Sequence, residues 1–168
     1  MNDKAKATEA ALFGDLADVM GLSRPAGQCF ALIWRAARSP CADDLVAGLG
    51  LARSNVSTAL KELRAWNLIS IARAPGDRKE YFTAPTDPWE VLRLMTLARH
   101  RLMLTPLLER LVSAEAASGD VRLAALHSVM DEMARAAGVI GGLDGATFAQ
   151  RIALMSATDQ AKKKKKKH

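Results

Sequence analysis

The residues with the clearest chemical potential lie between Arg53 and Glu80, where cations and short polar side chains follow a helical spacing and then a strand spacing. Val56, Leu60 and Leu63 recur at i, i+4 and i+7, so they line one helical face for a core. The remaining faces carry hydroxyls, an amide and cations, which suit the base edges and phosphates of a nucleic acid. These residues are Arg53, Ser54, Asn55, Ser57, Thr58, Lys61 and Arg64.

A β-hairpin is expected directly after this helix. The pattern changes to alternating apolar residues at 68–71, breaks at 74–77 around a Pro-Gly pair, and resumes at 80–83, with Arg78 and Lys79 near the tip. Upstream, residues 43–49 form a short helix with acidic residues in its first turn, followed by a turn at 50–52. A recognition helix at about 53–66 and a wing at about 68–84 therefore predict a winged helix-turn-helix, whose second helix enters the major groove of DNA.

Residues 21 to about 112 resemble the MarR-type winged-helix regulators, specifically the GbsR-like branch. The most specific elements are the segment GLSRPAG at 21–27 and the wing GDRKEY at 76–81. The resemblance implies that Arg78 enters the minor groove, where a narrow A·T tract concentrates negative potential. Asp77 beside it is expected to orient that arginine. Family members often respond to a small ligand, and this branch includes sensors of quaternary ammonium compounds.

One position departs from the family pattern. The family commonly has serine just before the recognition helix, as an N-cap, and this chain has Ala52. Alanine cannot cap, which forgoes about 1 kcal/mol of helix stabilisation. Ser54 is an alternative cap that would start the helix later and move Asn55 and Ser57 relative to the groove, so the base-reading residues stay open at this point.

The charge of the chain is concentrated in two places. Six of its 24 Lys and Arg residues are Lys162–Lys167, and without them 18 basic residues face 18 acidic ones. We therefore interpret residues 159–168 as a disordered or tag-like tail and exclude them from the fold. The sequence does not show whether this lysine run is native. Between Arg53 and Glu80, six cations accompany three acids. A neutral body with a locally basic segment is what selective phosphate contact requires.

Other classes of protein find little support in the sequence. No apolar run approaches the ~20 residues of a membrane helix, and the N-terminus has no signal-peptide core, so a cytoplasmic protein is expected. Cys29 and Cys41 are too few for a disulfide framework or zinc knuckle; Cys29 suits inert packing, and Cys41, at a helix start, would be the more reactive if either senses redox. His100 and His127 lack a partner at metal spacing, and no catalytic arrangement can be assembled. We expect no enzyme, cofactor or metal.

The expected fold is mainly α with a small β-hairpin wing. Residues 1–86 form the winged helix-turn-helix, beginning with a helix at 4–20 that carries Leu12, Leu16 and Val19 on one face, and a helix from a Ser23 cap to about Arg38. Residues 87–158 form a helical dimerisation region. A capping box at 87–90 starts its first helix, Pro106 kinks or restarts it, Gly119-Asp120 opens another, and Asp144 caps a last helix with Phe148, Ile152 and Met155 inward.

The helices after residue 87 carry more apolar residues than one stripe can hide, and residues 123–140 keep a strict 3-4 spacing, so we expect a homodimer. The candidate dimerisation residues are Leu94, Leu97, Leu104, Leu108, Leu126, Met130 and Met133. Such a dimer would bind a near-palindromic operator in double-stranded DNA, with half-sites about 10 base pairs apart. It would act as a ligand-responsive repressor; the alternative is a winged-helix interaction or assembly module without a specific operator.

The effector of such a repressor is not identified by the sequence. Aromatic cages bind quaternary cations, and Trp34, Trp66 and Trp89 are the available walls, although core packing is the more common role of such side chains.

Overall fold

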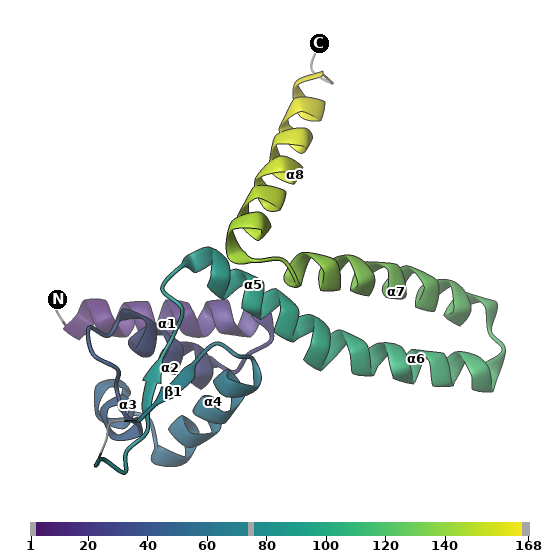
Figure 1. The fold of residues 1–168 in the computed structure, drawn as a ribbon. Coiled ribbons are helices and arrows are strands. Elements are labelled where there is room, and N and C mark those ends of the chain that lie inside the picture. Colours follow the sequence, from purple (N-terminus) through teal and green to yellow (C-terminus); the bar gives the residue numbers. More distant parts are fainter. Residues whose placement is uncertain (1–2, 74–75, 166–168) are drawn as a thin grey trace. The chain divides into compact units, whose positions relative to one another are not determined.

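The computed structural model describes residues 3–73 and 76–165, with side chains from residue 8 to residue 157. The chain divides into two compact units between Thr86 and Asp87. It is mainly helical, with a single two-stranded sheet among the described residues (Figure 1). The expected fold class, helices with a small β-hairpin, is confirmed.

The first unit contains four helices and the hairpin. Its elements are α1 (Asp3–Met20), α2 (Arg24–Arg35), α3 (Ala42–Leu49), α4 (Arg53–Ala65), β1 (Ser70–Ala72) and β2 (Tyr81–Thr83). Ser23 caps α2, as expected, by accepting from the Ala26 N–H at 3.3 Å. The helix stops at Arg35, short of the expected end near Arg38, because the backbone is already extended at Ala36 and runs on to the sheet at Pro40.

The core of this unit is built from the inner faces of α2, α3 and α4. Phe30, Leu45, Val56 and Leu63 are fully buried or nearly so. A methyl group at Gly27 would lie 2.2 Å from the carbonyl oxygen of Phe13, so α2 approaches α1 too closely for any larger residue. The GLSRPAG segment thus includes the contact that fixes this helix pair.

The face of α1 that carries Leu12, Leu16 and Val19 is exposed; Ala17, on another face, is buried against α2. Apolar side chains in a row on a helix commonly mark an interaction surface.

The helix-turn-helix is made by α3 and α4. Gly50 ends α3 in the left-handed region at φ 65°, where glycine has no steric penalty. Ala52 has extended backbone angles and its carbonyl accepts the first intrahelical bond from Val56 N–H, so α4 begins at Arg53. The alternative start at Ser54 is therefore wrong.

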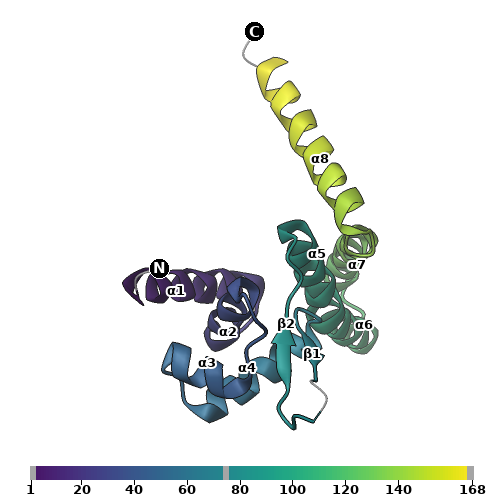
Figure 2. The same cartoon turned by 60° about the vertical axis from the view of Figure 1, so that its left-hand side comes forward.

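The wing is an antiparallel hairpin in which Ser70, Ile71 and Ala72 pair with Thr83, Phe82 and Tyr81 (Figure 2). β1 begins later than residue 68, because the Leu68 N–H bonds back to the Leu63 carbonyl and closes the end of α4, with Asn67 left-handed between them. Residues 40–41 extend the pairing: the Phe82 N–H donates to Pro40 O, and Cys41 forms a bridge with Tyr81. Two residues of the predicted break, 74 and 75, lie outside the described residues.

The second unit consists of helices. They are α5 (Pro88–Arg99), a π-helical turn η1 (His100–Leu104), α6 (Thr105–Ser118), α7 (Val121–Gly141) and α8 (Gly145–Lys165). Asp87 and Asp144 cap α5 and α8 as the sequence predicts, and Asp120 caps α7, which begins where Gly119-Asp120 predicts a helix start. The expected capping box at 87–90 is only half formed, because both carboxylate oxygens of Glu90 accept from Arg93.

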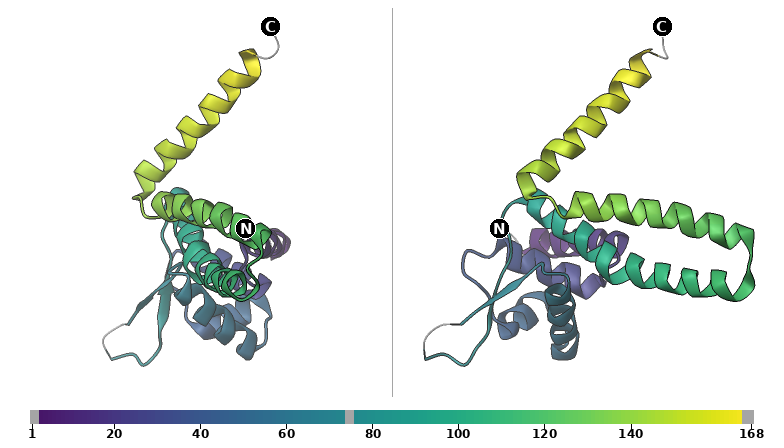
Figure 3. Two further views of the ribbon diagram at one scale, coloured as in Figure 1. Left: turned by 90° about the vertical axis from the view of Figure 1, so that its right-hand side faces the viewer. Right: turned by 45° about the vertical axis from the view of Figure 1, so that its right-hand side comes forward.

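The interruption expected at Thr105-Pro106 takes the form of the π turn. Pro106 has no N–H to donate, and the Thr105 N–H reaches back five residues to the His100 carbonyl. α5, η1 and α6 follow one another along a nearly continuous rod, and α7 returns beside α6 (Figure 3).

α8 leaves the end of α7 and extends away from α5 and α7 (Figure 3). Phe148 is buried beside Trp89, with ring centroids 6.2 Å apart, whereas Met155 is 60% exposed. The expectation that Met155 faces inward is wrong, because α8 has left the body of the unit by that point. The helix continues to Lys165, through part of the segment 159–168 that the sequence predicts to be disordered, since Ala, Gln and Lys favour helix and cations suit a helix C-terminus.

Candidate nucleic-acid interface

A groove of about 400 Å³ separates α4 from the wing, and cations from both sides line it. α4 contributes Arg53, Lys61 and Arg64, and the wing contributes Arg78 and Lys79. Two carboxylates, Asp43 and Glu80, share the groove. A concave surface with this excess of cations attracts a polyanion.

The polar residues of α4 fall into two rows. Arg53, Ser57, Lys61 and Arg64 recur every three or four positions and line the groove beside the wing. A second row is exposed outside the groove and holds Ser54, Asn55 and Thr58. The structure thus separates Ser57 from the other candidates for base contact and places it among the cations.

The first row is positioned by the buried face of α4, where Val56, Ala59, Leu60 and Leu63 pack into the core. A second restraint comes from α2: Glu62 accepts hydrogen bonds from the Ser23 N–H at 2.9 Å and the Ser23 hydroxyl at 2.5 Å. Ser23 therefore caps α2 and holds α4 at once. The sequence did not indicate this link, because the two residues are 39 positions apart.

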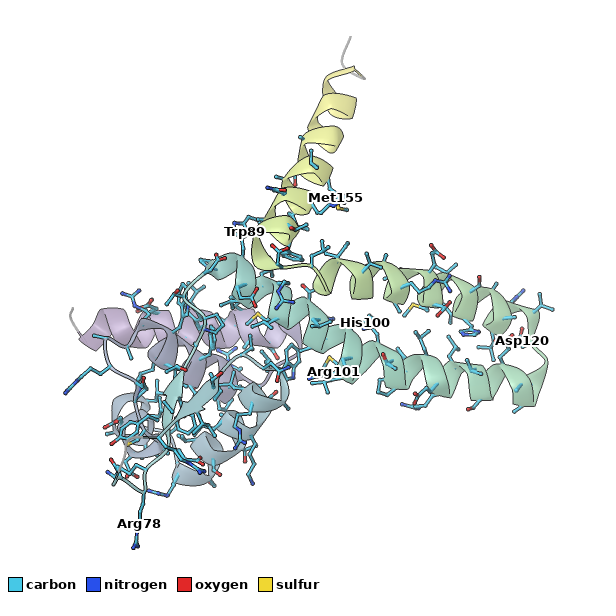
Figure 4. All side chains as sticks on the ribbon, viewed as in Figure 1. Arg78, Trp89, His100, Arg101, Asp120 and Met155 are labelled. Carbon is cyan, nitrogen blue, oxygen red and sulfur yellow. The ribbon has the colours of Figure 1, made fainter. Side chains whose placement is uncertain are left out.

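The wing is shaped by Asp77. Its carboxylate accepts from the Tyr81 hydroxyl at 2.6 Å and from the Lys79 N–H at 2.9 Å. These bonds hold the pKa of Asp77 below its ordinary value and raise the pKa of Tyr81. Asp77 thus shapes the wing backbone, which corrects the expectation that it orients the Arg78 side chain. Arg78 itself is exposed and extends away from the wing (Figure 4).

The candidate dimerisation residues divide by exposure. Leu126 and Met133, on α7, are exposed, whereas Leu94, Leu97, Leu104, Leu108 and Met130 are half-buried within the second unit. Residues 123–140 therefore form two rows rather than one. Leu123, Met130 and Ile140 are half-buried, and the other row, with Val129 and Val139 beside Leu126 and Met133, is open.

The three tryptophans have separate environments. Trp34 packs between Phe13 and Phe30, at centroid distances of 5.7 and 6.4 Å, and its buried Nε1–H has no acceptor among the described residues. Trp66 is buried in the first unit, and Trp89 contacts Phe148 in the second. Trp34 and Trp66 therefore belong to the packing of the first unit, and Trp89 remains 40% exposed beside Phe148. A role for these tryptophans in ligand binding stays a prediction.

Both cysteines are buried, and His100 and His127 each contact a neighbouring helix. Cys29 is buried, and desolvation raises the pKa of its thiol to about 12, so it is inert packing. Cys41 is also buried. His127 Nδ1 lies 2.8 Å from Glu115 across the α6–α7 turn, and His100 packs against Gly138. Between residues 3–73 and 76–165, no three His, Cys, Asp or Glu residues gather in a metal-binding arrangement, and no helix there is long and apolar enough to cross a membrane.

The sequence matches no protein-family model and no curated protein. The structure, in contrast, is similar to a crystal structure of a transcriptional regulator, with a TM-score of 0.68 and 19% sequence identity over 82% of this chain and 96% of that one. A MarR family transcriptional regulator from Rhodococcus sp. RHA1 superposes less closely, with a TM-score of 0.40 and 16% identity over 80% of this chain and 85% of that one. At 19% identity the first similarity shows a shared fold, and the chain therefore has the fold of that transcriptional regulator, with a winged helix-turn-helix and a helical second unit.

Proposed function

We propose that this chain is a sequence-specific, DNA-binding transcriptional regulator of the MarR type, in its GbsR-like branch. The observation that carries the proposal is the groove in which Arg53, Lys61 and Arg64 of α4 face Arg78 and Lys79 of the wing. A helix flanked by a basic hairpin fits a duplex, with the helix in the major groove and the hairpin against the neighbouring backbone or minor groove.

The two rows on α4 support a division of labour. The groove row is rich in cations, which favours phosphate contacts that position the protein on any sequence. The outer row offers hydroxyls and the amide of Asn55, which can pair with adenine in bidentate fashion. Specificity is therefore assigned to Ser54, Asn55 and Thr58.

A homodimer is part of the proposal. It is supported by the large apolar side chains that stay exposed on the second unit, among them Leu107 and Val112 on α6 and Leu126, Val129 and Met133 on α7. Large apolar side chains that stay exposed in this number on neighbouring helices are typical of an interaction surface. A two-fold axis would place the recognition helices of two subunits against the two halves of a near-palindromic operator.

Repression is the proposed direction of regulation, because a dimer seated on a promoter excludes the transcription machinery. A small-molecule effector stays a prediction from the family resemblance, since Trp34 and Trp66 already serve the core of the first unit.

The proposal is tested by titrating the full chain against duplex fragments of its own upstream region, with excess random-sequence competitor and a salt series. We expect one fragment to stay bound in competitor that removes all others, and log K to fall linearly with log salt. Binding to every duplex alike, or to none, would instead favour a winged-helix interaction module without an operator.

A further inference from the structure

Asp43 joins the two halves of the candidate DNA interface. It lies in the first turn of α3, and its Oδ1 is 2.6 Å from Arg53 Nη1 at the first residue of α4. Its Oδ2 is 3.6 Å from Lys79 Nζ in the wing. One carboxylate therefore bridges the recognition helix and the wing.

The carboxylate is ionised at neutral pH. The Arg53 guanidinium holds the pKa of Asp43 below its ordinary value, and the Lys79 ammonium adds to this effect. Both cations belong to the set that lines the groove. The negative charge of Asp43 thus lies where the proposed function requires positive charge.

A carboxylate and a phosphate offer a guanidinium the same kind of partner, a pair of anionic oxygens. The Asp43, Arg53 and Lys79 side chains are 49%, 75% and 56% exposed, so a DNA strand has access to them. Ion pairs as exposed as these are weak, and the dense charge of a duplex competes with them. The contacts made by Asp43 are therefore exchangeable.

We propose that Asp43 is an internal substitute for a DNA phosphate, which holds Arg53 and Lys79 in the free protein and gives them up when the protein binds DNA. This inference rests on the proposed DNA-binding function. Its consequence is that Asp43 sets an upper limit on affinity for duplexes of any sequence, because each complex must break its ion pairs and tolerate its charge. Removing the carboxylate strengthens binding to random DNA.

The test is the Asp43→Asn variant of the full chain, titrated with a random-sequence duplex over a range of salt concentrations. We expect binding about two- to fivefold tighter, the range set by one exposed ion pair. The slope of log K against log salt steepens by about 0.9 for each additional phosphate that the variant neutralises. Asp43→Ser is a second neutral variant, acceptable in the first turn of a helix, and it should reproduce the result.

Asp15→Asn is the matched control. Asp15 pairs with Arg24 at 2.5 Å between α1 and α2, so this variant makes the same charge change and breaks an exposed ion pair outside the groove. Its effect on DNA affinity should be smaller. A double-mutant cycle adds a second readout: the increase in affinity from Asp43→Asn should shrink in an Arg53→Gln background, because the freed partner is missing.

Three outcomes overturn the inference. The first is that Asp43→Asn and Asp43→Ser both unfold at the wild-type temperature and bind random DNA no more tightly than wild type. The second is that Asp15→Asn raises DNA affinity as much as Asp43→Asn does. The third is that the effects of Asp43→Asn and Arg53→Gln on DNA affinity are fully additive. Failure of the proposed function is a different result, because it shows in the wild-type chain, which would then bind every duplex alike or bind none.

Discussion

At the scale of single residues, the decisive feature is the way α4 divides its polar side chains between two directions. Lys61 lies in the groove with the wing cations, and Asn55 and Thr58 lie outside that groove. A cation among cations contributes to phosphate binding at every sequence, whereas an amide or hydroxyl on a base edge contributes only at the correct sequence. The two kinds of residue therefore differ in what their removal changes.

We predict that Asn55→Ala or Thr58→Ala lowers the ratio of operator affinity to random-DNA affinity, by about 1–3 kcal/mol where a good base contact is lost. Lys61→Ala should weaken both targets alike and flatten the salt slope by about 0.9. Paired titrations with operator and random duplexes measure both effects. A change of sequence preference from Lys61→Ala, with none from Asn55→Ala, would reverse the roles assigned to the two rows.

At the scale of elements, α4 begins without a side-chain cap. Ala52 has the extended angles of an N-cap residue, φ −61° and ψ 144°, but no oxygen with which to accept from the first turn. Position 52 therefore has the backbone conformation of an N-cap but a side chain that cannot accept a hydrogen bond.

We predict that Ala52→Ser raises the free energy of unfolding by about 1 kcal/mol, because the hydroxyl supplies the missing acceptor without a change of backbone. Chemical denaturation of the purified chain measures the increase. Ala47→Ser, at an exposed position inside α3, is the control and should be neutral or slightly destabilising. An equal increase at both positions would show that capping is not the cause.

The junction of α5, α7 and α8 depends on an ion pair that is largely withdrawn from solvent. Arg93 makes two hydrogen bonds of 2.7 Å to Glu90 and donates a third to the Gly141 carbonyl at the end of α7. The bonds from Arg93 hold the pKa of Glu90 below its ordinary value. A carboxyl with a depressed pKa stabilises the fold above its unfolded-state pKa, and this contribution is lost as the pH falls through its folded-state pKa.

We predict that Glu90→Gln lowers the free energy of unfolding at pH 7 by about 1–2 kcal/mol, a range that allows for partial exposure. The difference from wild type should shrink as the pH falls below about 4.3, the usual glutamate pKa. Thermal unfolding at a series of pH values follows both effects. Glu132→Gln, which removes an exposed partner of Arg135, should change little at any pH. A pH-independent deficit in Glu90→Gln would rule out the ion pair as its origin.

At the scale of the whole molecule, the proposed dimer would use apolar surfaces that stay exposed on the second unit. Leu126 and Met133 are 50% and 56% exposed on α7, while Leu104 and Leu108, in η1 and α6, are half-buried. Charged residues at 104 and 108 would disturb the packing of the second unit, so they cannot separate dimerisation from folding. Charged residues at the exposed positions Leu126 and Met133 of α7 can test dimerisation without disturbing the fold.

We predict that wild type is a dimer and that Leu126→Glu with Met133→Glu converts it to a folded monomer. Operator binding should weaken strongly, because each half-site alone contributes only part of the affinity. Light scattering and DNA titration on the same samples measure the two effects. Ser128→Glu adds a charge to α7 outside the apolar row and should leave both unchanged. A monomeric variant that still binds two half-sites with full affinity would contradict the role given to the dimer.

The sequence alone determined the elements whose signals are local. Ser23, Asp87 and Asp144 cap helices where the sequence predicts them, and the helix-turn-helix and its hairpin follow from apolar spacing and turn residues within a few positions of each other. Capping, periodicity and turn chemistry act over one or two turns of chain, so a linear reading can detect them.

The tertiary structure alone decided which residues meet and which faces stay open. The hydrogen bonds that Ser23 donates to Glu62 and Arg53 donates to Asp43, and the ion pair of Asp43 with Lys79, join residues 10 to 39 positions apart, and no local pattern indicates them. The apolar residues at 123–140, expected to form one stripe, form two rows on α7, and this too depends on tertiary packing. A helix with apolar residues on two sides has the same periodicity whichever side its own chain covers, so only packing determines that Met130 is half-buried while Leu126 and Met133 remain exposed.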